Sequence, residues 1–297
     1  MAIFRARSSA KINLSLDILD RLPNGYHTLR SLVHPVGLWD ELELELHDAP
    51  QIAFSCDNEE LRGDDNLCVR AFKAWRDAAN YKGGASIRLQ KNIPFGAGLG
   101  GGSGNAAAVL RLANAGKNAL GESELHRIAT KLGADVPLFL GENPVLMEGI
   151  GERLTPVAPL DGWVVLLKPS EGFATPAIYR AWDEGQTLSQ NGTEALLEAW
   201  PRAEVSSVAP LLTNDLERAA RMVSPLPARC IQLLEEAGAL GARLSGSGSA
   251  CFGLCSSQEK ARAVQSKVDV ELAKDVLLRN ATTFVAPLVA RGVELLS

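Results

Sequence analysis

The stretch that decides the fold, PFGAGLGGGSGNAAAVL, occupies residues 94–110. Six of its first twelve residues are glycine, and three alanines follow them. The alternating segment at residues 85–91 predicts a strand before this loop, and the alanine-rich segment predicts a helix from about residue 103 to residue 115. Glycines let backbone N–H groups approach a ligand closely, and a helix N-terminus adds a partial positive charge. The stretch therefore predicts a cradle for the phosphates of a nucleotide.

Known phosphate-binding signatures narrow the kind of loop. The sequence has no GxxxxGKS/T segment, which excludes the ordinary P-loop, and it has neither the HRD nor the DFG segment of protein kinases. Gly96, Gly98 and Gly101 do match the spacing of the dinucleotide fingerprint. That fingerprint requires a second strand after the helix, whereas residues 123–132 predict a second helix. An NAD-dependent oxidoreductase is therefore only a distant alternative.

The composition limits the partners of the protein. The chain has 297 residues, with 30 Lys and Arg against 35 Asp and Glu, and a formal net charge of −5. This is an ordinary globular composition, and the length favours two domains. An acidic chain argues against a nucleic-acid partner, whose binding depends on neutralising backbone phosphates. A phosphorylated small molecule remains compatible with the charge, because backbone amides bind phosphate without formal charge.

The sequence also indicates a compartment. No apolar run approaches the ~18–20 residues that a membrane-spanning helix needs, so we expect no membrane association. The five cysteines are scattered and form no CxxC pair, which is typical of reduced thiols in the cytoplasm. We therefore expect a cytoplasmic protein with no thiolate metal site.

Hydrophobic periodicity predicts mixed helices and strands. The segment at residues 11–18 alternates, with Lys11 and Asn13 on its polar face, and residues 41–47 alternate as cleanly. Further helices are predicted at residues 66–80, 123–132, 176–183, 193–200, 214–223, 228–237 and 257–267, and further strands at residues 163–168, within 243–254 and near 275–283. Pro156, Pro159 and Gly162 indicate a domain boundary near residue 158.

Five segments together carry a resemblance to a known family. The glycine-rich stretch resembles the central motif of the GHMP kinases. AKINLSLDILDRLPNGYHTL at residues 10–29, LGADVP at 132–137, GIGERL at 149–154 and LSGSGSACFGL at 244–254 resemble those members that act on a cytidine diphosphate-linked methylerythritol. The order of the segments matches over nearly the whole chain.

The resemblance implies a fold and an activity. It implies an α+β, two-domain GHMP kinase fold, with a ribosomal-protein-S5-domain-2-like N-terminal domain at residues 1–158 and a ferredoxin-like C-terminal domain at residues 159–297. It further implies ATP- and Mg²⁺-dependent phosphorylation of the 2-hydroxyl of that small molecule, in the non-mevalonate route to isoprenoid precursors. Neither nucleic acid nor membrane is an expected partner, and the chain is expected to be a monomer or a homodimer.

Two residues are implied to be catalytic. Taken alone, Lys11 reads as a solvated surface lysine and Asp135 as a turn or capping aspartate. The resemblance places both at catalytic positions, where Asp135 would accept the proton of the substrate hydroxyl while Lys11 orients Asp135 and stabilises developing charge. Phosphoryl transfer depends mainly on such positioning and charge stabilisation.

The resemblance also implies a nucleotide site. The loop has no lysine of its own, so Mg²⁺ must offset much of the triphosphate charge, and no compact carboxylate pair for the ion is visible. The resemblance implies that Ser103 is the nearest hydroxyl for this ion. Gly104 departs from the family, which more often has a second serine there, so a hydroxyl contact to phosphate is lost. The implied nucleotide-binding residues are Asn66, Leu67, Lys91, Pro94, Phe95, Gly96, Ala97, Gly98, Leu99, Gly100, Gly101, Gly102, Ser103 and Gly104.

The substrate site is implied by five further residues. An aromatic ring can stack on a base and an imidazole can hydrogen-bond to its edge. The resemblance assigns Tyr26 and His27 to the cytosine, Tyr179 to its other face, and Asn13 and Thr175 to the erythritol or diphosphate. Without it, Tyr26 reads as half-buried core and His27 as a turn residue. The open alternatives are another GHMP kinase, acting on mevalonate, homoserine or a sugar, and a catalytically silent nucleotide-binding relative.

Overall fold

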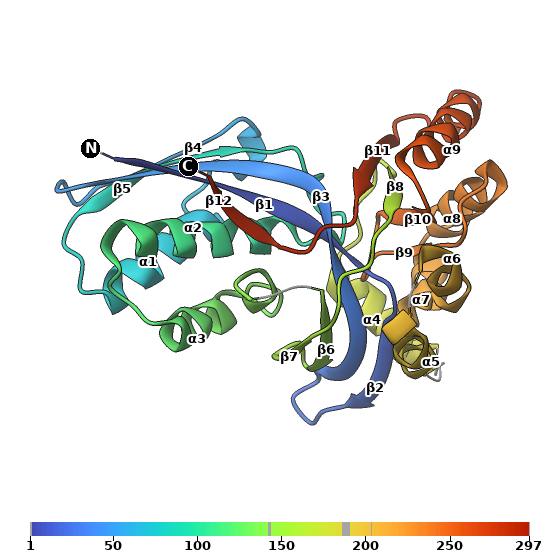
Figure 1. Ribbon diagram of the computed structural model, residues 1–297, viewed down its shortest axis with the longest axis horizontal. Coiled ribbons are helices and arrows are strands. Elements are labelled where there is room, and N and C mark those ends of the chain that lie inside the picture. The colour runs from blue at the N-terminus through green and yellow to red at the C-terminus, as the bar shows by residue number, and fades with distance from the viewer. Residues whose placement is uncertain (1, 142–143, 186–190, 203, 297) are drawn as a thin grey trace.

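Two antiparallel-rich sheets, each covered by helices, make up the protein (Figure 1). The computed structural model describes residues 2–141, 144–185, 191–202 and 204–296. Within these residues, the larger sheet runs in the order β12-β1-β3-β5-β4, with β2, β6 and β7 attached through β3, and the smaller sheet runs β11-β8-β10-β9. Helices α1, α2 and α3 lie along one side of the larger sheet, and α8 and α9 lie beside the smaller one (Figure 1).

The strands and helices have the following bounds. The larger sheet contains β1 (Ile3–Asn13), β2 (Asp17–Arg21), β3 (His27–His47), β4 (Ile52–Cys56), β5 (Gly84–Gln90), β6 (Val145–Gly149), β7 (Arg153–Pro156) and β12 (Val293–Leu296). The smaller sheet contains β8 (Trp163–Lys168), β9 (Ala242–Leu244), β10 (Cys251–Cys255) and β11 (Thr282–Pro287). The helices are α1 (Leu67–Ala78), α2 (Gly101–Lys117), α3 (Glu122–Leu132), α4 (Thr175–Glu184), α5 (Gly192–Ala199), α6 (Val205–Val208), α7 (Leu216–Val223), α8 (Leu226–Ala237) and α9 (Gln258–Leu272). None of the helices within the described ranges is long and apolar enough to cross a membrane.

Helix α1 shows how the sequence specifies its elements. Asn66 precedes the helix, and its side-chain oxygen accepts a hydrogen bond from the backbone N–H of Cys68 at 2.8 Å, which caps the first turn. Val69, Phe72 and Trp75 recur at helical spacing and are buried. The predicted helix at residues 66–80 is therefore confirmed, with Asn66 as its N-cap.

The predicted strand at residues 11–18 is wrong in its bounds. Strand β1 begins at Ile3 and ends at Asn13, and a bend separates it from β2, which begins at Asp17. The polar side of the segment is also buried, with Lys11 at 6% and Asn13 at 1% exposure. Alternation in the sequence correctly indicates an extended chain, but here its polar side faces protein groups and a cavity rather than solvent.

The predicted strand near residues 275–283 is wrong over its first half. The chain turns there, because Asp275 Oδ1 accepts the backbone N–H of Leu277 at 3.0 Å, and the strand β11 begins only at Thr282. Val276 and Leu277 look like strand residues in the sequence, yet they are 77% and 60% exposed. Asp275 also forms an ion pair with Arg229 of α8 at 2.7 Å, which holds the turn against the body of the protein.

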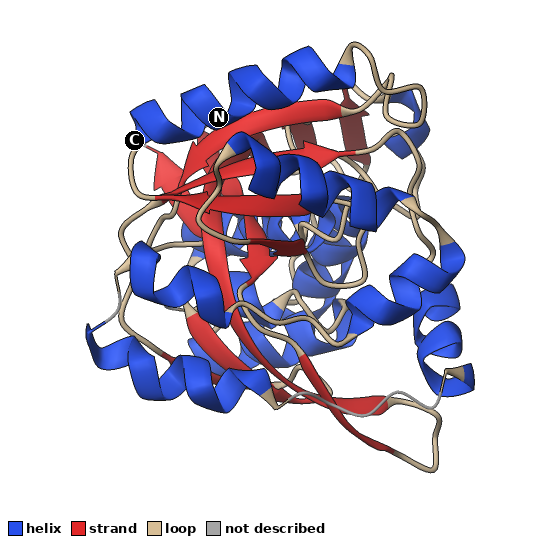
Figure 2. Cartoon of the chain, turned by 90° about the vertical axis from the view of Figure 1, so that its right-hand side faces the viewer, coloured by secondary structure: helices blue, strands red, loops and turns tan. Residues whose placement is uncertain are grey.

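A long strand forms a projecting hairpin in the larger sheet, and a shared apolar core joins the two sheets. Strand β3 runs for 21 residues, and its first part forms with β2 the hairpin that projects at the bottom of both views (Figure 1, Figure 2). Ile12 and Leu14, at and just after the end of β1, lie in one apolar cluster with Leu166 of β8 and Phe252 of β10. The end of β1 is therefore fixed by both sheets at once.

The last strand returns to the first. Strand β12 pairs antiparallel with β1, and Leu296 lies opposite Arg5 (Figure 1). The short strand has no strong sequence signal, and we did not expect it. The predicted boundary near residue 158 stays a prediction, and β12 makes the larger sheet depend on residues from both ends of the chain.

Candidate active site

The glycine-rich loop lies between the two sheets. Its main chain is held on both sides, because Leu99 O accepts the N–H of Lys11 at 2.9 Å and Ala97 O accepts the N–H of Ala250 at 3.0 Å. Gly98 has a φ of +74°, and a Cβ there would lie 2.4 Å from the backbone oxygen of Ser245. Glycine is therefore required at this position both by conformation and by the close approach of the 245–250 segment.

The loop leads directly into helix α2. Gly100, with a φ of +72°, is the residue before the helix, which begins at Gly101, two residues earlier than predicted. The N–H groups of the first turn have no partners within a helix and suit an anion. Ser103 lies in this first turn and faces two cavities.

The first cavity fits the predicted nucleotide site. It has a volume of about 420 Å³ and opens between the loop, the start of α1 and the end of β5. Glu60, Leu61 and Asp65 add to its wall and were not predicted. The predicted residues that line it are Asn66, Leu67, Lys91, Pro94, Phe95, Gly96, Ala97, Gly98, Leu99, Gly100, Gly101, Gly102 and Ser103.

Gly104 is the one predicted nucleotide residue outside both cavities. It is buried, and a Cβ there would lie 3.3 Å from Ser8 Cβ and 3.3 Å from Ser9 O on β1. This direction leads away from the cavity and into the packing between α2 and the larger sheet. A serine at this position would therefore meet β1, and the missing hydroxyl is no loss to a phosphate in this geometry.

Lys91 has a partner of its own. Its ammonium donates to the carboxylate of Asp40, which is fully buried and also accepts the backbone N–H groups of Asn92 and Ile93 at 2.8 Å each. A Cβ at Gly101 would lie 3.1 Å from Lys91 Nζ, so the charge stands directly beside the start of α2. Asp40 thus fixes a cation at the nucleotide cavity, and no feature of the sequence indicated this carboxylate.

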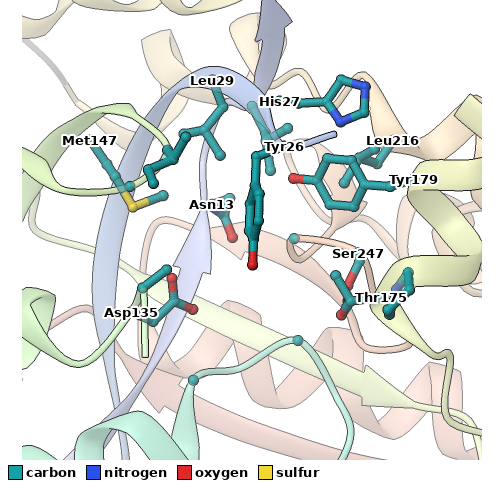
Figure 3. Close-up of a pocket in the computed structure, with 18 of the residues that line it drawn as sticks. Asn13, Tyr26, His27, Leu29, Asp135, Met147, Thr175, Tyr179, Leu216 and Ser247 are labelled. Atoms are coloured by element: carbon teal, nitrogen blue, oxygen red, sulfur yellow. Dashed lines mark hydrogen bonds between the residues drawn. The ribbon is translucent and has the colours of Figure 1, made fainter. Parts of the chain in front are cut away.

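The second cavity is larger and contains the other predicted residues. It has a volume of about 760 Å³ and meets the first cavity at Gly98, Gly100 and Ser103. Figure 3 shows residues from β1, β3 and α4 pointing into it, with Asp135 on the opposite wall. The predicted residues that line it are Lys11, Asn13, Tyr26, His27, Asp135, Thr175 and Tyr179.

Lys11 is held inside this cavity by a polar chain. Its Nζ donates to Asn13 Oδ1 at 2.7 Å, Asn13 Nδ2 donates to Ser31 Oγ at 2.8 Å, and Ser31 Oγ donates to Ser15 O at 2.5 Å. Burial lowers the pKa of Lys11 from its ordinary value of 10.5, and the negative charge of Asp135 partly offsets this. The ammonium is therefore a desolvated cation aimed by Asn13.

Asp135 lies at a corner after helix α3. Gly133 ends the helix, and Pro137 begins a short 3₁₀ turn, so the backbone between them is fixed. The carboxylate makes no ion pair with Lys11 in the described structure, although its charge acts on the pKa of both Lys11 and Tyr179. Lys11 and Asp135 thus face one cavity without neutralising each other.

An aromatic group closes the other end. Tyr26 is 64% exposed and points into the cavity, and Tyr179 points toward it from helix α4 (Figure 3). The His27 ring stacks on Tyr179, with centroids 5.2 Å apart and an interplanar angle of 27°. One face of Tyr179 is therefore covered by protein, and burial, together with the charge of Asp135, raises the pKa of its hydroxyl to about 12.

Several cavity residues were missed by sequence reasoning. Thr175 Oγ1 lies 2.8 Å from Ser247 Oγ, which joins helix α4 to the glycine-serine turn between β9 and β10. That turn lies in the segment at residues 244–254 that resembles the family, and this signal could have indicated Ser247 as a site residue. Other missed lining residues are Leu16, Arg21, Asn24, Gly25, Leu29, Ala134, Met147, Ile150, Gly151, Pro176, Arg180, Asp183, Leu216 and Gly246.

Comparison with known proteins gives the same family. Residues 66–142 match the GHMP kinases N terminal domain, and residues 196–274 match the GHMP kinases C terminal domain. A 4-diphosphocytidyl-2-C-methyl-D-erythritol kinase of Pelobacter propionicus is 38% identical over 269 residues, which cover 88% of this chain and 93% of that protein. The relative from Symbiobacterium thermophilum, with the same name, is 39% identical over 257 residues, covering 84% of this chain and 90% of that one.

A solved structure extends the similarity to three dimensions. The crystal structure of a 4-(cytidine 5'-diphospho)-2C-methyl-D-erythritol kinase matches with a TM-score of 0.81 and 34% identity, over 96% of this chain and 98% of that one. The predicted α+β GHMP kinase fold is thereby confirmed. The chain belongs to the 4-diphosphocytidyl-2-C-methyl-D-erythritol kinase family of the GHMP kinases.

Proposed function

We propose that this protein transfers the γ-phosphoryl group of ATP to the 2-hydroxyl of 4-diphosphocytidyl-2-C-methyl-D-erythritol. The observation that carries the proposal is the junction of two cavities at Gly98, Gly100 and Ser103, with Lys11 and Asp135 lining the larger one. A nucleotide in the smaller cavity and an acceptor in the larger one would bring their reacting ends to this junction. Such positioning supplies much of the catalysis of phosphoryl transfer.

Asp135 is proposed to accept the proton of the acceptor hydroxyl. It lines the acceptor cavity at a corner fixed by Gly133 and Pro137. A carboxylate within hydrogen-bond reach of the hydroxyl orients the attacking oxygen and takes the proton as the new O–P bond forms. The fixed corner favours this role, because it holds the backbone that carries the carboxylate in one place beside the cavity.

Lys11 and the start of α2 are proposed to stabilise the transferring phosphoryl group. The Lys11 ammonium is buried, so its interaction with a developing negative charge is weakened little by water. The N–H groups at the start of α2 face the same junction and add the partial charge of the helix. Asn13 accepts a hydrogen bond from the ammonium and so orients it, which means that Asn13 acts on the phosphoryl group through Lys11.

Ser103 is proposed as the protein ligand of a magnesium ion that accompanies ATP. The described residues contain no cluster of three or more His, Cys, Asp or Glu side chains that could hold a metal. A single hydroxyl fits Mg²⁺, which usually keeps several waters and takes its other ligands from the nucleotide phosphates. Bound there, the ion would offset the charge of the triphosphate, and Lys91 would add a second cation nearby.

The aromatic end of the larger cavity is proposed to bind the cytosine ring. Tyr26 and the uncovered face of Tyr179 offer stacking surfaces, and His27 offers a hydrogen bond to the edge of the base. Thr175 and Asn13 line the same cavity, and the erythritol and diphosphate would contact them. The arrangement supports a nucleotide-linked acceptor over mevalonate, homoserine or galactose, which have no base to stack.

The test is ADP release with ATP and Mg²⁺ against a panel of acceptors. The panel contains the cytidine substrate, its CMP-free erythritol phosphate, mevalonate, homoserine and galactose. We expect turnover with the cytidine substrate alone, and turnover only with another acceptor would overturn the proposal.

A variant tests the role of Asp135 in the same assay. Asp135→Asn should lower turnover by at least about 10²-fold, since general-base catalysis contributes about 10²–10⁴-fold, while ATP binding measured by calorimetry stays close to wild type. Asp48→Asn, an exposed aspartate in the turn after β3, is the matched control and should keep full turnover. Retention of most turnover by Asp135→Asn would remove Asp135 as the base.

A further inference from the structure

A hydrogen-bonded chain behind His27 is not explained by the roles above. His27 Nε2 lies 2.7 Å from Asp183 Oδ1, and Arg21 Nη1 lies 3.5 Å from Asp183 Oδ2. The His27 side chain is 6% exposed and that of Asp183 is 27% exposed, so the imidazole is the better shielded partner. Asp183 and Tyr179 are four residues apart on α4 and therefore lie on the same face of the helix, where both contact this one ring.

The carboxylate decides which ring nitrogen carries the proton. A carboxylate only accepts hydrogen bonds, so the Nε2 that lies against it is the N–H donor. In the neutral imidazole the other nitrogen, Nδ1, then keeps its lone pair and is an acceptor. Among the described residues, no group forms a hydrogen bond with Nδ1, and His27 lines the acceptor cavity.

A lone pair at this place distinguishes two pyrimidine bases. Cytosine carries an amino group, a hydrogen-bond donor, at its position 4, whereas a uracil-type ring carries a carbonyl oxygen, an acceptor, at the same position. An acceptor on the protein binds the first and repels the second. A donor on the protein, which the opposite tautomer would present, favours the second.

We propose that Asp183 is a positioning residue that makes this site select cytosine over uracil, by holding His27 in the Nε2–H tautomer so that Nδ1 accepts from the exocyclic amino group. Arg21 assists by pairing with the same carboxylate. The inference rests on the proposed function, because it requires the base of the acceptor to lie at His27. It adds a source of base selectivity that stacking on Tyr26 and Tyr179 does not provide, since every base has a face that can stack.

The test compares kcat/KM for the cytidine substrate and for its uridine analogue, with ATP and Mg²⁺ held constant. Wild-type protein should prefer the cytidine acceptor by about tenfold to hundredfold, the range of one good base-edge contact. In Asp183→Asn the amide can present either its oxygen or its NH₂ group to His27, so neither tautomer is enforced. The preference should fall by about tenfold through a higher KM for the cytidine acceptor, with kcat and the KM for ATP nearly unchanged.

Glu184→Gln is the matched control. It removes the same charge from the next residue of α4, where the side chain is exposed and does not line the cavity. This variant should keep the wild-type preference. A fall in preference equal to that of Asp183→Asn would mean that only the charge of the helix matters, and would overturn the inference.

A spectroscopic measurement makes the test independent of turnover and of the folding of any variant. The ¹⁵N chemical shifts of the His27 ring in labelled wild-type protein report the tautomer directly, and the Nε2–H form is expected. The inference would be overturned if the shifts report the Nδ1–H form. It would also be overturned if Asp183→Asn keeps the wild-type preference for the cytidine acceptor, or loses kcat/KM equally for both acceptors. If wild-type protein phosphorylates both acceptors equally, the inference is overturned while the proposed function stands. If it phosphorylates neither acceptor, the inference and the proposed function are both overturned.

Discussion

Burial gives Lys11 a chemistry that a surface lysine lacks. The residue looks ordinary in the sequence, because a lysine on the polar side of a strand is usually solvated. In the folded protein this side faces a cavity, and the ammonium is 6% exposed and bonded to Asn13. Desolvation raises the free energy of the charged form and lowers the pKa of Lys11, while the charge of Asp135 limits the fall.

The pH dependence of turnover should report this environment. The charged form of Lys11 is the one that stabilises a phosphoryl group, so turnover should fall as the pH rises through the pKa of Lys11, below the ordinary value of 10.5. In Lys11→Arg the side chain stays charged over the same range, so the alkaline fall should vanish although the rate is lower. The measurement is a pH–rate profile of both proteins at saturating substrates. A Lys11→Arg profile with the same alkaline limb as wild type would assign that limb to another group.

At the scale of the element, the glycine-rich loop combines two different demands on glycine. Gly96 and Gly98 both have positive φ values, +65° and +74°. A Cβ at Gly96 would meet nothing within 4 Å, whereas a Cβ at Gly98 would lie 2.4 Å from Ser245 O and 2.8 Å from Gly248 O. Gly96 is therefore required by conformation alone, and Gly98 also by contact with a backbone that cannot move cheaply.

A pair of alanine variants separates these demands. Gly96→Ala should raise the free energy of the folded loop by about 1–2 kcal/mol, because alanine is strained in the left-handed conformation. Gly98→Ala carries the same strain and in addition displaces the loop from the 245–250 segment. The ATP affinity of Gly98→Ala should therefore be at least about tenfold lower than that of Gly96→Ala. Isothermal titration with an ATP analogue measures both variants. Equal losses in the two proteins would show that the packing of Gly98 against Ser245 is unimportant for the nucleotide site.

Elements with a local signal could be predicted from the sequence, and those defined by distant partners could not. Helix α1 has its own cap and apolar stripe, and strand β8 is an apolar run between turn residues, so both were predicted nearly to the residue. Strand β12 exists because β1 offers it an edge, and the turn at Asp275 exists because Arg229 holds it. Neither partner can be read from the local sequence.

The same division applies to the candidate site. The glycine loop is a contiguous stretch, so its residues that line the cavity were predicted except for Asn105, and Gly104 is the one predicted loop residue that lies outside the cavity. Asp40 and Asp183 enter the site from distant parts of the chain, and an isolated aspartate has no distinguishing pattern, whereas Ser247 lies in the glycine-serine segment that resembles the family. The roles given to Lys11 and Asp135 came from the family resemblance and remain predictions.

For the whole molecule, a buried histidine ties the two halves together. His34 of β3 is fully buried, and its Nε2 accepts the backbone N–H of Leu160, at the start of the second half, at 3.1 Å. Its Nδ1 lies 2.9 Å from Pro35 O and donates to it. Burial lowers the pKa of His34 to about 4, because a second ring proton would lose the bond to Leu160 and leave a charge in the core.

The stability of the protein should therefore fall in mild acid. The unfolded chain binds a proton at His34 near the ordinary value of 6.5, and the folded chain only near 4, so the stabilisation is complete above pH 6.5 and is lost as the pH falls toward 4. Between pH 7.5 and pH 5 the loss should be about 2 kcal/mol. Urea unfolding of wild type, His34→Gln and the control His126→Gln measures it. The same loss of stability in His34→Gln as in wild type over this interval would show that another group titrates.

The pairing of β12 with β1 bears on the order of events during synthesis. A ribosome makes β1, which bears Lys11, long before it makes β12, because the other strands and the helices named above lie between them in the sequence. Until β12 emerges, one edge of β1 has no partner over Arg5 to Ser8, and an open strand edge invites pairing with other chains. A nascent chain of this protein thus exposes an open edge on the strand that carries Lys11, and this edge stays open until the distant strand β12 has been made and has paired with it.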